Sequence, residues 1–193
     1  TVTIENTVPV LADVTLSPDP AYEADTLICT PGDITDADGS VGFDTTYTWE
    51  VNGVDIGETG DTLDGDSFDR DDDVVCIVTP GDGDDEGDAV RSNTITIANS
   101  LPEVTAVTLL PSTVYTDDTV TATAASSDGD GDPVSLTYEW YVEGSQVAAT
   151  GSTLDGSIYF DKDAEVYVVV TPYDGEADGY AVTSDGIVVS NTA

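Results

Sequence analysis

Three short segments constrain the fold of this 193-residue chain more than any other feature, because each alternates large apolar residues with polar ones. The first segment carries Cys29, the second carries Trp49 and the third carries Cys76. Alternation with a period of two buries one face of a segment, as in a half-buried β-strand. Two cysteine-bearing strands on facing sheets, with a tryptophan packed against their bridge, predict a two-sheet β-sandwich.

The same frame recurs about 92 residues later without the cysteines, at an offset that stays nearly constant through the chain. Trp140 takes the place of Trp49, Ala122 that of Cys29 and Val168 that of Cys76. We therefore predict an all-β chain of two tandem immunoglobulin-like β-sandwich domains, residues 7–98 and 99–193. Residues 1–6 repeat the sequence of the last strand of each domain, and we interpret them as the closing strand of a preceding or neighbouring domain.

The strands of the first domain are expected where alternating residues are bounded by Gly, Pro and Asp, which favour turns. Asn52-Gly53 is a favourable two-residue hairpin turn. Pro80 and Pro172 are expected to end their strands because proline cannot donate to a sheet. No segment has helical periodicity, so essentially no helix is predicted. The expected strands are residues 10–16, 25–30, 45–52, 54–57, 62–68, 73–79 and 89–98.

The composition excludes several functions. The chain has 40 Asp and Glu against three basic residues, a net charge of −37, which argues against nucleic acid and anionic membranes as partners. It has no histidine, so Ser-His-Asp and Cys-His catalysis are excluded, and we expect no enzymatic activity. No apolar run approaches the roughly 18 residues of a membrane span. Because methionine is absent even at position 1, we expect a mature or excised segment.

Cys29 and Cys76 are predicted to form a disulfide, and the alternative is two buried free thiols. A bridge would indicate an oxidising, extracellular location, since disulfides are rare in the cytosol.

Carboxylates gather in the loops between the predicted strands, often at alternate positions with glycine between them. Such loops can curl several oxygens toward one point, and Ca²⁺ takes six to eight oxygen ligands. An EF-hand is excluded because no helices flank the loops and no glutamate follows at the twelfth position. The alternative to calcium is a solvated acidic surface, as in salt-adapted proteins. The candidate metal ligands are Asp36, Asp38, Asp69, Asp71 and Asp82 of the first domain and Glu103, Asp128, Asp130, Asp132 and Asp174 of the second.

The topology of a seven-strand sandwich adds an expectation about the domain junction. It would bring Glu23, Asp69, Asp71 and the linker residue Glu103 toward the loops of the second domain that hold Asp128, Asp130, Asp132 and Asp174. So many carboxylates repel one another unless a cation lies among them.

Several motifs carry a family resemblance that covers both domains: Thr-Tyr-Thr-Trp49-Glu-Val-Asn-Gly, the Asp-x-Asp-Gly loops, Val-Thr-Pro80-x-Asp-Gly and Ser92-Asn-Thr-Ile-Thr-Ile. With them the chain resembles the tandem immunoglobulin-like repeats of large prokaryotic extracellular proteins, close in style to cadherin-like calcium-binding modules of surface adhesins. The resemblance implies a stalk, adhesin or filament on the cell exterior.

The sequence therefore favours an extracellular structural repeat protein that forms a rod or a head-to-tail filament, stiffened by calcium. Its expected partners are copies of itself and possible contacts on the cell surface or extracellular matrix. The alternative is a carbohydrate-binding or stalk accessory module of a secreted enzyme. That alternative requires an exposed aromatic platform, for which Tyr141, Tyr167 and Tyr180 are the candidates.

Overall fold

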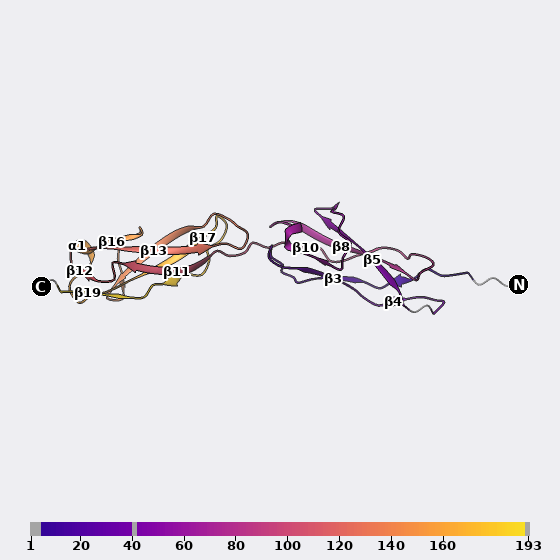
Figure 1. Cartoon of the computed structure of the whole chain (residues 1–193), viewed down its shortest axis with the longest axis horizontal. Coiled ribbons are helices and arrows are strands. Elements are labelled where there is room, and N and C mark those ends of the chain that lie inside the picture. The colour runs from indigo at the N-terminus through magenta and orange to yellow at the C-terminus, as the bar shows by residue number, and fades with distance from the viewer. Residues whose placement is uncertain (1–4, 40–41, 192–193) are drawn as a thin grey trace. The chain divides into compact units, whose positions relative to one another are not determined.

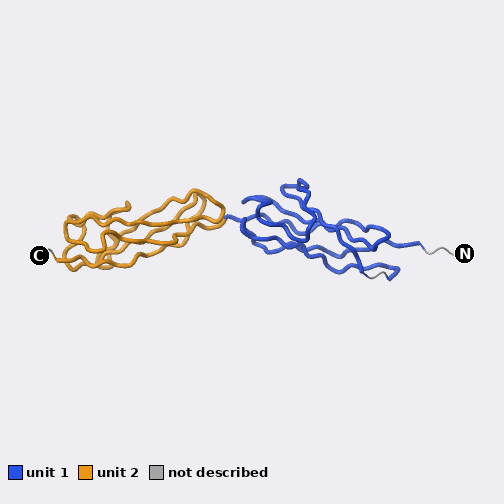
Figure 2. The backbone as a smooth tube through the Cα atoms, in the orientation of Figure 1, with its two compact units in different colours: residues 1–99 blue, residues 100–193 orange. Residues whose placement is uncertain are grey.

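The computed structural model describes residues 5–39 and 42–191, and nearly all of its regular structure is β (Figure 1). The chain divides into two compact units, residues 1–99 and 100–193 (Figure 2). Each unit is an immunoglobulin-like sandwich of two mainly antiparallel sheets, so the predicted fold class is confirmed. The predicted closing strand at residues 1–6 lies largely outside the described residues.

The first unit places β2, β3 and β7 in one sheet and β10, β8, β5 and β6 in the other, with β9 beside β8 and a separate β1–β4 pair. Its strands are β1 (Val10–Leu11), β2 (Val14–Ser17), β3 (Leu27–Pro31), β4 (Ile34–Thr35), β5 (Asp44–Val51), β6 (Val54–Asp55), β7 (Thr62–Leu63), β8 (Asp73–Gly81), β9 (Val90–Arg91) and β10 (Ile95–Thr96).

The second unit repeats this arrangement, with β11, β13 and β16 in one sheet and β12, β19, β17, β14 and β15 in the other, where β18 also pairs with β17. Its elements are β11 (Glu103–Leu110), β12 (Val114–Tyr115), β13 (Thr119–Ser127), β14 (Ser135–Val142), β15 (Ser145–Gln146), β16 (Thr153–Asp155), α1 (Gly156–Tyr159), β17 (Glu165–Tyr173), β18 (Val182–Thr183) and β19 (Ile187–Ser190).

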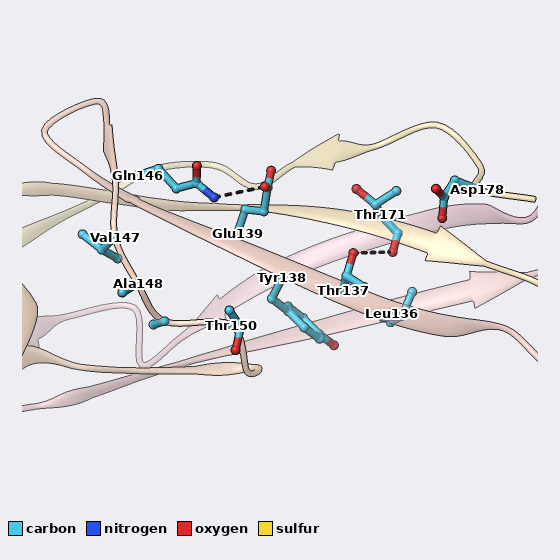
Figure 3. A pocket seen from close by; sticks show the side chains of 11 residues that line it. Leu136, Thr137, Tyr138, Glu139, Gln146, Val147, Ala148, Thr150, Thr171 and Asp178 are labelled. Carbon is cyan, nitrogen blue, oxygen red and sulfur yellow. Dashed lines mark hydrogen bonds between the residues drawn. The ribbon is translucent and has the colours of Figure 1, made fainter.

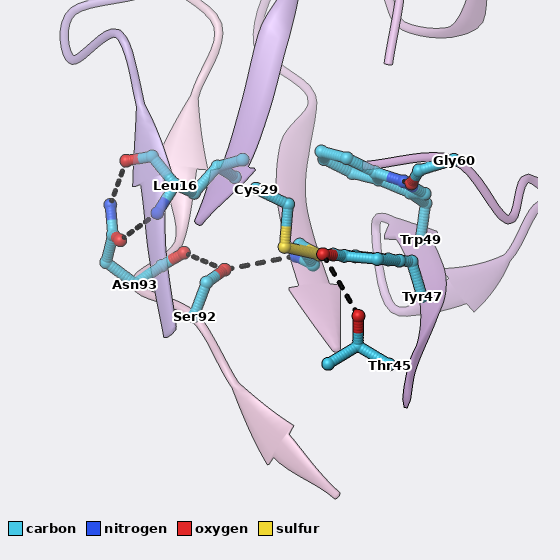
Figure 4. Close-up of a disulfide and its surroundings, with 9 residues drawn as sticks. Leu16, Cys29, Thr45, Tyr47, Trp49, Gly60, Ser92 and Asn93 are labelled. Carbon is cyan, nitrogen blue, oxygen red and sulfur yellow. Dashed lines mark hydrogen bonds between the residues drawn. A yellow bond between two sulfur atoms is a disulfide. The ribbon is translucent and has the colours of Figure 1, made fainter. Parts of the chain in front are cut away.

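The predicted disulfide is present and joins the two sheets of the first unit (Figure 4). Cys29 on β3 and Cys76 on β8 have their Cα atoms 6.1 Å apart. In the second unit the equivalent Ala122 and Val168 are 4 % and 0 % exposed. Apolar packing there replaces the covalent link, which shows that the sandwich does not require the bridge at this point.

One tryptophan lies at the centre of each core. Trp49 and Trp140 are both completely buried. The indole N–H of Trp49 donates to the carbonyl of Gly60, and that of Trp140 donates to the carbonyl of Gly151, each at 2.8 Å. The polar end of each ring is therefore satisfied inside the core, as buried indoles require.

Several boundaries of the predicted strands are wrong. β8 continues through Pro80, which stands opposite Thr45, and β17 continues through Pro172, which stands opposite Leu136. At both positions a backbone N–H would point away from the neighbouring strand, so proline is tolerated there. The predicted strand at residues 62–68 ends at Leu63, and its last part is a 3₁₀ turn. The second unit likewise forms the one-turn helix α1, and because only these two short turns are helical among the described residues, the expectation of essentially no helix is confirmed.

The predicted last strand of the first unit is also interrupted, and side chains explain the break. Ser92 Oγ accepts a hydrogen bond from the Cys76 N–H at 3.0 Å. The Asn93 side chain accepts from the N–H of Leu16 at 2.8 Å and donates to the Leu16 carbonyl at 3.2 Å (Figure 4). In the break between β9 and β10, the Ser92 N–H still donates to the Cys76 carbonyl at 2.9 Å, and these side chains supply the other hydrogen bonds. The hairpin turn at Asn52-Gly53 is confirmed, with φ of 53° and 76°.

Replacing the disulfide with the residues of the second unit, Cys29→Ala with Cys76→Val, is expected to leave the first unit folded but less stable. The bridge closes a sequence separation of 47 residues, for which chain entropy predicts a loss of about 4 kcal/mol. Hydrogen exchange with mass spectrometry should show faster exchange in β5 and β8 and unchanged exchange in β14 and β17. Equal protection of β5 and β8 in the variant and the wild type would contradict this role.

Candidate metal centre

The loop after β13 is curled by its first carboxylate. Asp128 Oδ1 accepts backbone N–H groups from Asp130 at 2.9 Å and from Asp132 at 3.2 Å. This folds the loop back on itself, and one oxygen from each of the three carboxylates lies within 4.8 Å of the others. The structure thus brings together the three aspartates that the alternating sequence predicted as ligands.

Two oxygens of this cluster are buried without a hydrogen-bond partner in the described part of the chain, Asp128 Oδ2 and Asp130 Oδ1. The other Asp130 oxygen accepts the backbone N–H of Ser100 at 2.7 Å. A buried carboxylate oxygen without a partner is destabilising, because the charge has lost its water. A hard divalent cation would satisfy these oxygens, so the donor set fits calcium.

Asp174 lies at the same end of the second unit, directly after β17. Ser135 pairs with Tyr173, which places the start of this loop beside the end of the aspartate loop. The Asp174 side chain is only 6 % exposed, and its Oδ1 accepts the N–H groups of Glu176 and Ala177, each at 2.7 Å. Asp174 is therefore placed to support the cluster, although the group of three oxygens does not include it.

Glu103 begins β11 opposite Ser127, the last residue of β13. Its side chain is exposed, and it is not a member of the three-aspartate cluster. The structure therefore places Glu103 near the aspartate loop along the sheet but not among the converging oxygens.

The first unit repeats the design with one aspartate fewer. Asp36 Oδ1 accepts the N–H of Asp38 at 2.7 Å and the hydroxyl of Thr7 at 3.0 Å. The Thr7 N–H donates to Asp38 Oδ2 at 2.6 Å, as the Ser100 N–H does in the second unit. Asp36 Oδ2 is buried without a partner among the described residues, like the matching oxygen of Asp128. The position that matches Asp132 is Ser40, which lies outside the described residues.

Asp82 matches Asp174 and is strongly hydrogen bonded. Its oxygens accept N–H groups from Asp84 and Asp85 and the side-chain amide of Asn6 at 2.9 Å. The Asp85 N–H, then the Asn6 amide and the Asp84 N–H, lower the pKa of Asp82 from 3.8 to about 2.

Asp69 and Asp71 are exposed on the turn before β8, at the other end of the first unit from Asp36. The Asp69 N–H donates to Asp72, and an Asp71 oxygen lies 3.9 Å from Arg70 Nε. Neither aspartate joins a cluster of converging carboxylates among the described residues. Their expected association with the loops of the second unit stays a prediction.

The segments that lead into the two units, residues 6–9 and 99–102, were not predicted to take part in the site. The backbone N–H groups of Thr7 and Ser100 hold the aspartate loops, as described above. A Cβ on Gly179 would lie 1.8 Å from the Pro102 carbonyl, so this position requires glycine for the chain to pass so closely. Gly87 and Pro9 make the same approach in the first unit. The matching of Asn6-Thr7-Val-Pro9 with Asn99-Ser100-Leu-Pro102 was the available signal.

The three candidate tyrosines do not form one aromatic platform. Tyr141 and Tyr167 are half-buried and stack on each other, with ring centroids 5.0 Å apart and planes 2° apart. Tyr180 is 83 % exposed and is not part of this stack. The rings of Tyr141 and Tyr167 thus cover one another instead of lying flat for a sugar.

Comparison with known proteins supports no assignment beyond the fold. No family model matches the sequence, and no curated protein matches it. Among solved structures, the three N-terminal domains of the bacteriophage RB49 highly immunogenic outer capsid protein (Hoc) are similar with a TM-score of 0.34 and 18 % identity, over 92 % of this chain and 59 % of that chain.

Two further solved structures are similar at 10 % identity and a TM-score of 0.39 each: the chicken CNTN1 FN1-FN3 domains, over 95 % of this chain and 65 % of that one, and the N-terminal eight Ig domains of Down syndrome cell adhesion molecule (DSCAM), over 93 % and 24 %. This chain spans less than two thirds of each of the three neighbours. Likenesses this weak carry no argument about function.

In the described residues, no helix has the length and apolarity needed to cross a membrane.

Replacing Asn6 with alanine is expected to raise the pKa of Asp82 from about 2 toward its ordinary 3.8, because one donor to the carboxylate is lost. A lowered pKa in the folded state means that ionised Asp82 stabilises folding. This contribution is present above pH 3.8 and is lost as the pH falls through 2. A carboxyl-carbon NMR titration measures the shift, with Asn191→Ala as a matched control in the second unit. An unchanged Asp82 titration in Asn6→Ala would show that this hydrogen bond does not form in solution.

Proposed function

We propose that this chain is a calcium-binding structural segment of an extracellular repeat protein, which functions in surface adhesion or in a filament. One observation carries the proposal: a buried carboxylate oxygen without a partner occupies the same place in both units, Oδ2 of Asp36 and of Asp128. A solvated acidic surface would keep its carboxylate oxygens in water. Burial of the same oxygen twice favours a bound cation over general salt adaptation.

Calcium suits these loops better than other metals. The chain has no histidine, and its two cysteines form the disulfide, so the available donors are oxygens. Oxygen ligands in a flexible loop favour Ca²⁺, whereas Mg²⁺ demands a stricter octahedron and keeps more of its water. In the second unit Asp128, Asp130 and Asp132 would hold the ion, and water or backbone oxygens would complete its shell.

A bound ion would fix the segment that leads into the second unit. Asp130 would bind the ion through one oxygen while its other oxygen holds the Ser100 N–H. Asn99, the preceding residue, accepts a hydrogen bond from Arg70 in the first unit at 2.6 Å. Because Asn99 and Ser100 are consecutive, ordering of the aspartate loop would leave little free chain between the units. Calcium would thereby stiffen the protein along its length.

An extracellular location is supported by the disulfide, which persists in oxidising compartments, and by the calcium concentration that such loops would meet there. The motif resemblance to prokaryotic surface repeats and cadherin-like modules agrees with this location. We infer a mechanical role without enzymatic activity. In the described residues the only carboxylate cluster is that of Asp128, Asp130 and Asp132, and Asp128 accepts backbone N–H groups that hold its own loop.

Calcium is expected to bind the wild-type chain and to raise its melting temperature by mass action. At a free calcium concentration about 100 times Kd, the gain in unfolding free energy would be ~2.7 kcal/mol. Calorimetric titration and thermal unfolding measure both effects. If sodium chloride at matched ionic strength stabilises the chain equally and no binding heat appears, the acidic surface is a salt adaptation and the calcium proposal fails.

Asp128→Asn gives a sharper test. The amide keeps an oxygen to accept the N–H groups of Asp130 and Asp132 but replaces the partnerless oxygen with a donor. We expect the variant to be more stable than the wild type without calcium and to bind calcium at the second unit at least about tenfold more weakly. Asp117→Asn removes the same charge from an exposed residue at the other end of β13 and is the matched control. Equal calcium binding by the two variants would contradict the site.

The filament part of the proposal rests on the sequence of residues 1–5, which repeats the closing strands. Val2 and Ile4 would pair with another copy by strand addition. Val2→Asp with Ile4→Asp is expected to abolish self-association, whereas Thr1→Asp with Thr3→Asp places the same charges on the opposite face of the strand. Sedimentation and electron microscopy measure the assembly. A wild-type chain that stays monomeric at its highest soluble concentration would remove the filament while leaving the calcium site intact.

A further inference from the structure

A groove runs along one edge of β14 in the second unit (Figure 3). It encloses about 880 Å³ and opens where the chain diverges from β14 after β15. The strand β15 pairs only with Tyr141 and Val142, at the far end of β14. The first half of β14, from Ser135, therefore has β17 on one side and the groove on the other.

The backbone of β14 presents hydrogen-bonding groups to this groove. The Val147 N–H donates to the Trp140 carbonyl, so Trp140 directs its backbone toward the β15 side. Alternate residues of a strand direct their backbone groups to the same side. Tyr138 and Leu136 consequently point the same way, and no backbone partner meets them there among the described residues. An exposed strand edge of this kind can accept another strand.

The floor of the groove is apolar. Leu136 and Tyr138 line it from β14, and Val147 and Ala149 line it from the diverging segment. All four are partly buried and pack against the core of the second unit. In an added strand, the side chains that point toward the core would contact this small, preformed apolar surface.

The rim of the groove is acidic. Glu139 and Asp178 are exposed at its outer face, and Glu139 accepts a hydrogen bond from Gln146 at 3.0 Å (Figure 3). No lysine or arginine lines the groove. The one basic residue of the second unit, Lys162, lies 3.3 Å from Asp163 in the turn before β17. The rim charges thus favour a cationic partner.

The first unit has the same frame with different residues at the groove positions. Trp49 accepts the Ile56 N–H as Trp140 accepts that of Val147. The positions of Leu136 and Ala149, however, are Thr45 and Glu58 in the first unit. The first unit keeps large apolar side chains, Tyr47 and Ile56, at the positions of Tyr138 and Val147, so only the second unit has an apolar residue at all four positions.

We propose that this groove binds an extended segment of a partner protein, in which small apolar residues alternate with lysine or arginine. The segment pairs with β14 through the backbone groups of Leu136 and Tyr138. Its apolar side chains face Ala149 and its basic side chains face Glu139 and Asp178. This is strand addition to a sheet edge, in which backbone bonds supply affinity and alternate side chains supply specificity.

A second copy of this chain fits less well. The sequence of residues 1–5 has the required alternation but contains no lysine or arginine and ends in Glu5. In this groove Glu5 would also lie against the acidic rim of Glu139 and Asp178, where like charges repel. The acidic rim therefore selects a basic partner.

The test uses the full chain and a capped seven-residue peptide in which valine alternates with lysine, with the valine–glutamate peptide as its control. Calorimetry and NMR at physiological salt should show binding of the lysine peptide alone and slower exchange of the Tyr138 N–H in the complex. Thr150→Lys places a cation in the groove wall and should weaken binding at least about tenfold. Thr59→Lys adds the same charge at the equivalent position of the first unit and should leave binding unchanged.

Three results would overturn the proposal. The first is equal binding of both peptides or of both variants. The second is binding of the lysine peptide without protection of the Tyr138 N–H, which would indicate a diffuse attraction to the acidic surface. The third is self-association of the chain through β14, detected as Tyr138 protection without peptide, which would make a second copy the occupant.

Discussion

Each unit depends on the closure of two sheets over one buried tryptophan. The indole ring supplies the largest apolar area in each core, and its N–H is satisfied by a glycine carbonyl beyond the sheet edge. That single hydrogen bond fixes the path of the chain as it leaves the neighbouring short strand. Around this centre the cross-sheet contact can vary, since one unit links Cys29 to Cys76 and the other packs Ala122 and Val168.

Closure of the sandwich also decides where the acidic loops meet. The loop after β13 and the loop after β17 leave the sheets at the same end, so Asp128 and Asp174 come to one end of their unit. Backbone N–H groups then curl the first loop around Asp128 Oδ1. This satisfies one carboxylate oxygen but leaves the other buried without a partner, which is the cost that the proposed cation would offset.

The two units show how the same frame takes on different surfaces. On the outer face of the first unit, Glu50 and Arg91 form a bidentate ion pair at 3.0 and 2.7 Å, which lowers the pKa of Glu50. At the matching position of the second unit, Tyr141 stacks on Tyr167. Beside β14 the side chains differ as well, because Leu136 and Ala149 are Thr45 and Glu58 in the first unit. The two units therefore share one architecture and present different side chains on their surfaces.

The sequence by itself determined the fold class, the disulfide, the buried tryptophans and the grouping of Asp128, Asp130 and Asp132 in one loop, because alternation and internal repetition are local signals. It did not determine that strands run through Pro80 and Pro172, since the side on which a proline nitrogen points depends on the register with the neighbouring strand. Nor did it reveal which oxygens of Asp128 and Asp130 lack partners, or that the Ser100 N–H holds the loop. Those facts depend on contacts between residues about thirty or more positions apart, and only the folded chain brings such residues within hydrogen-bonding distance.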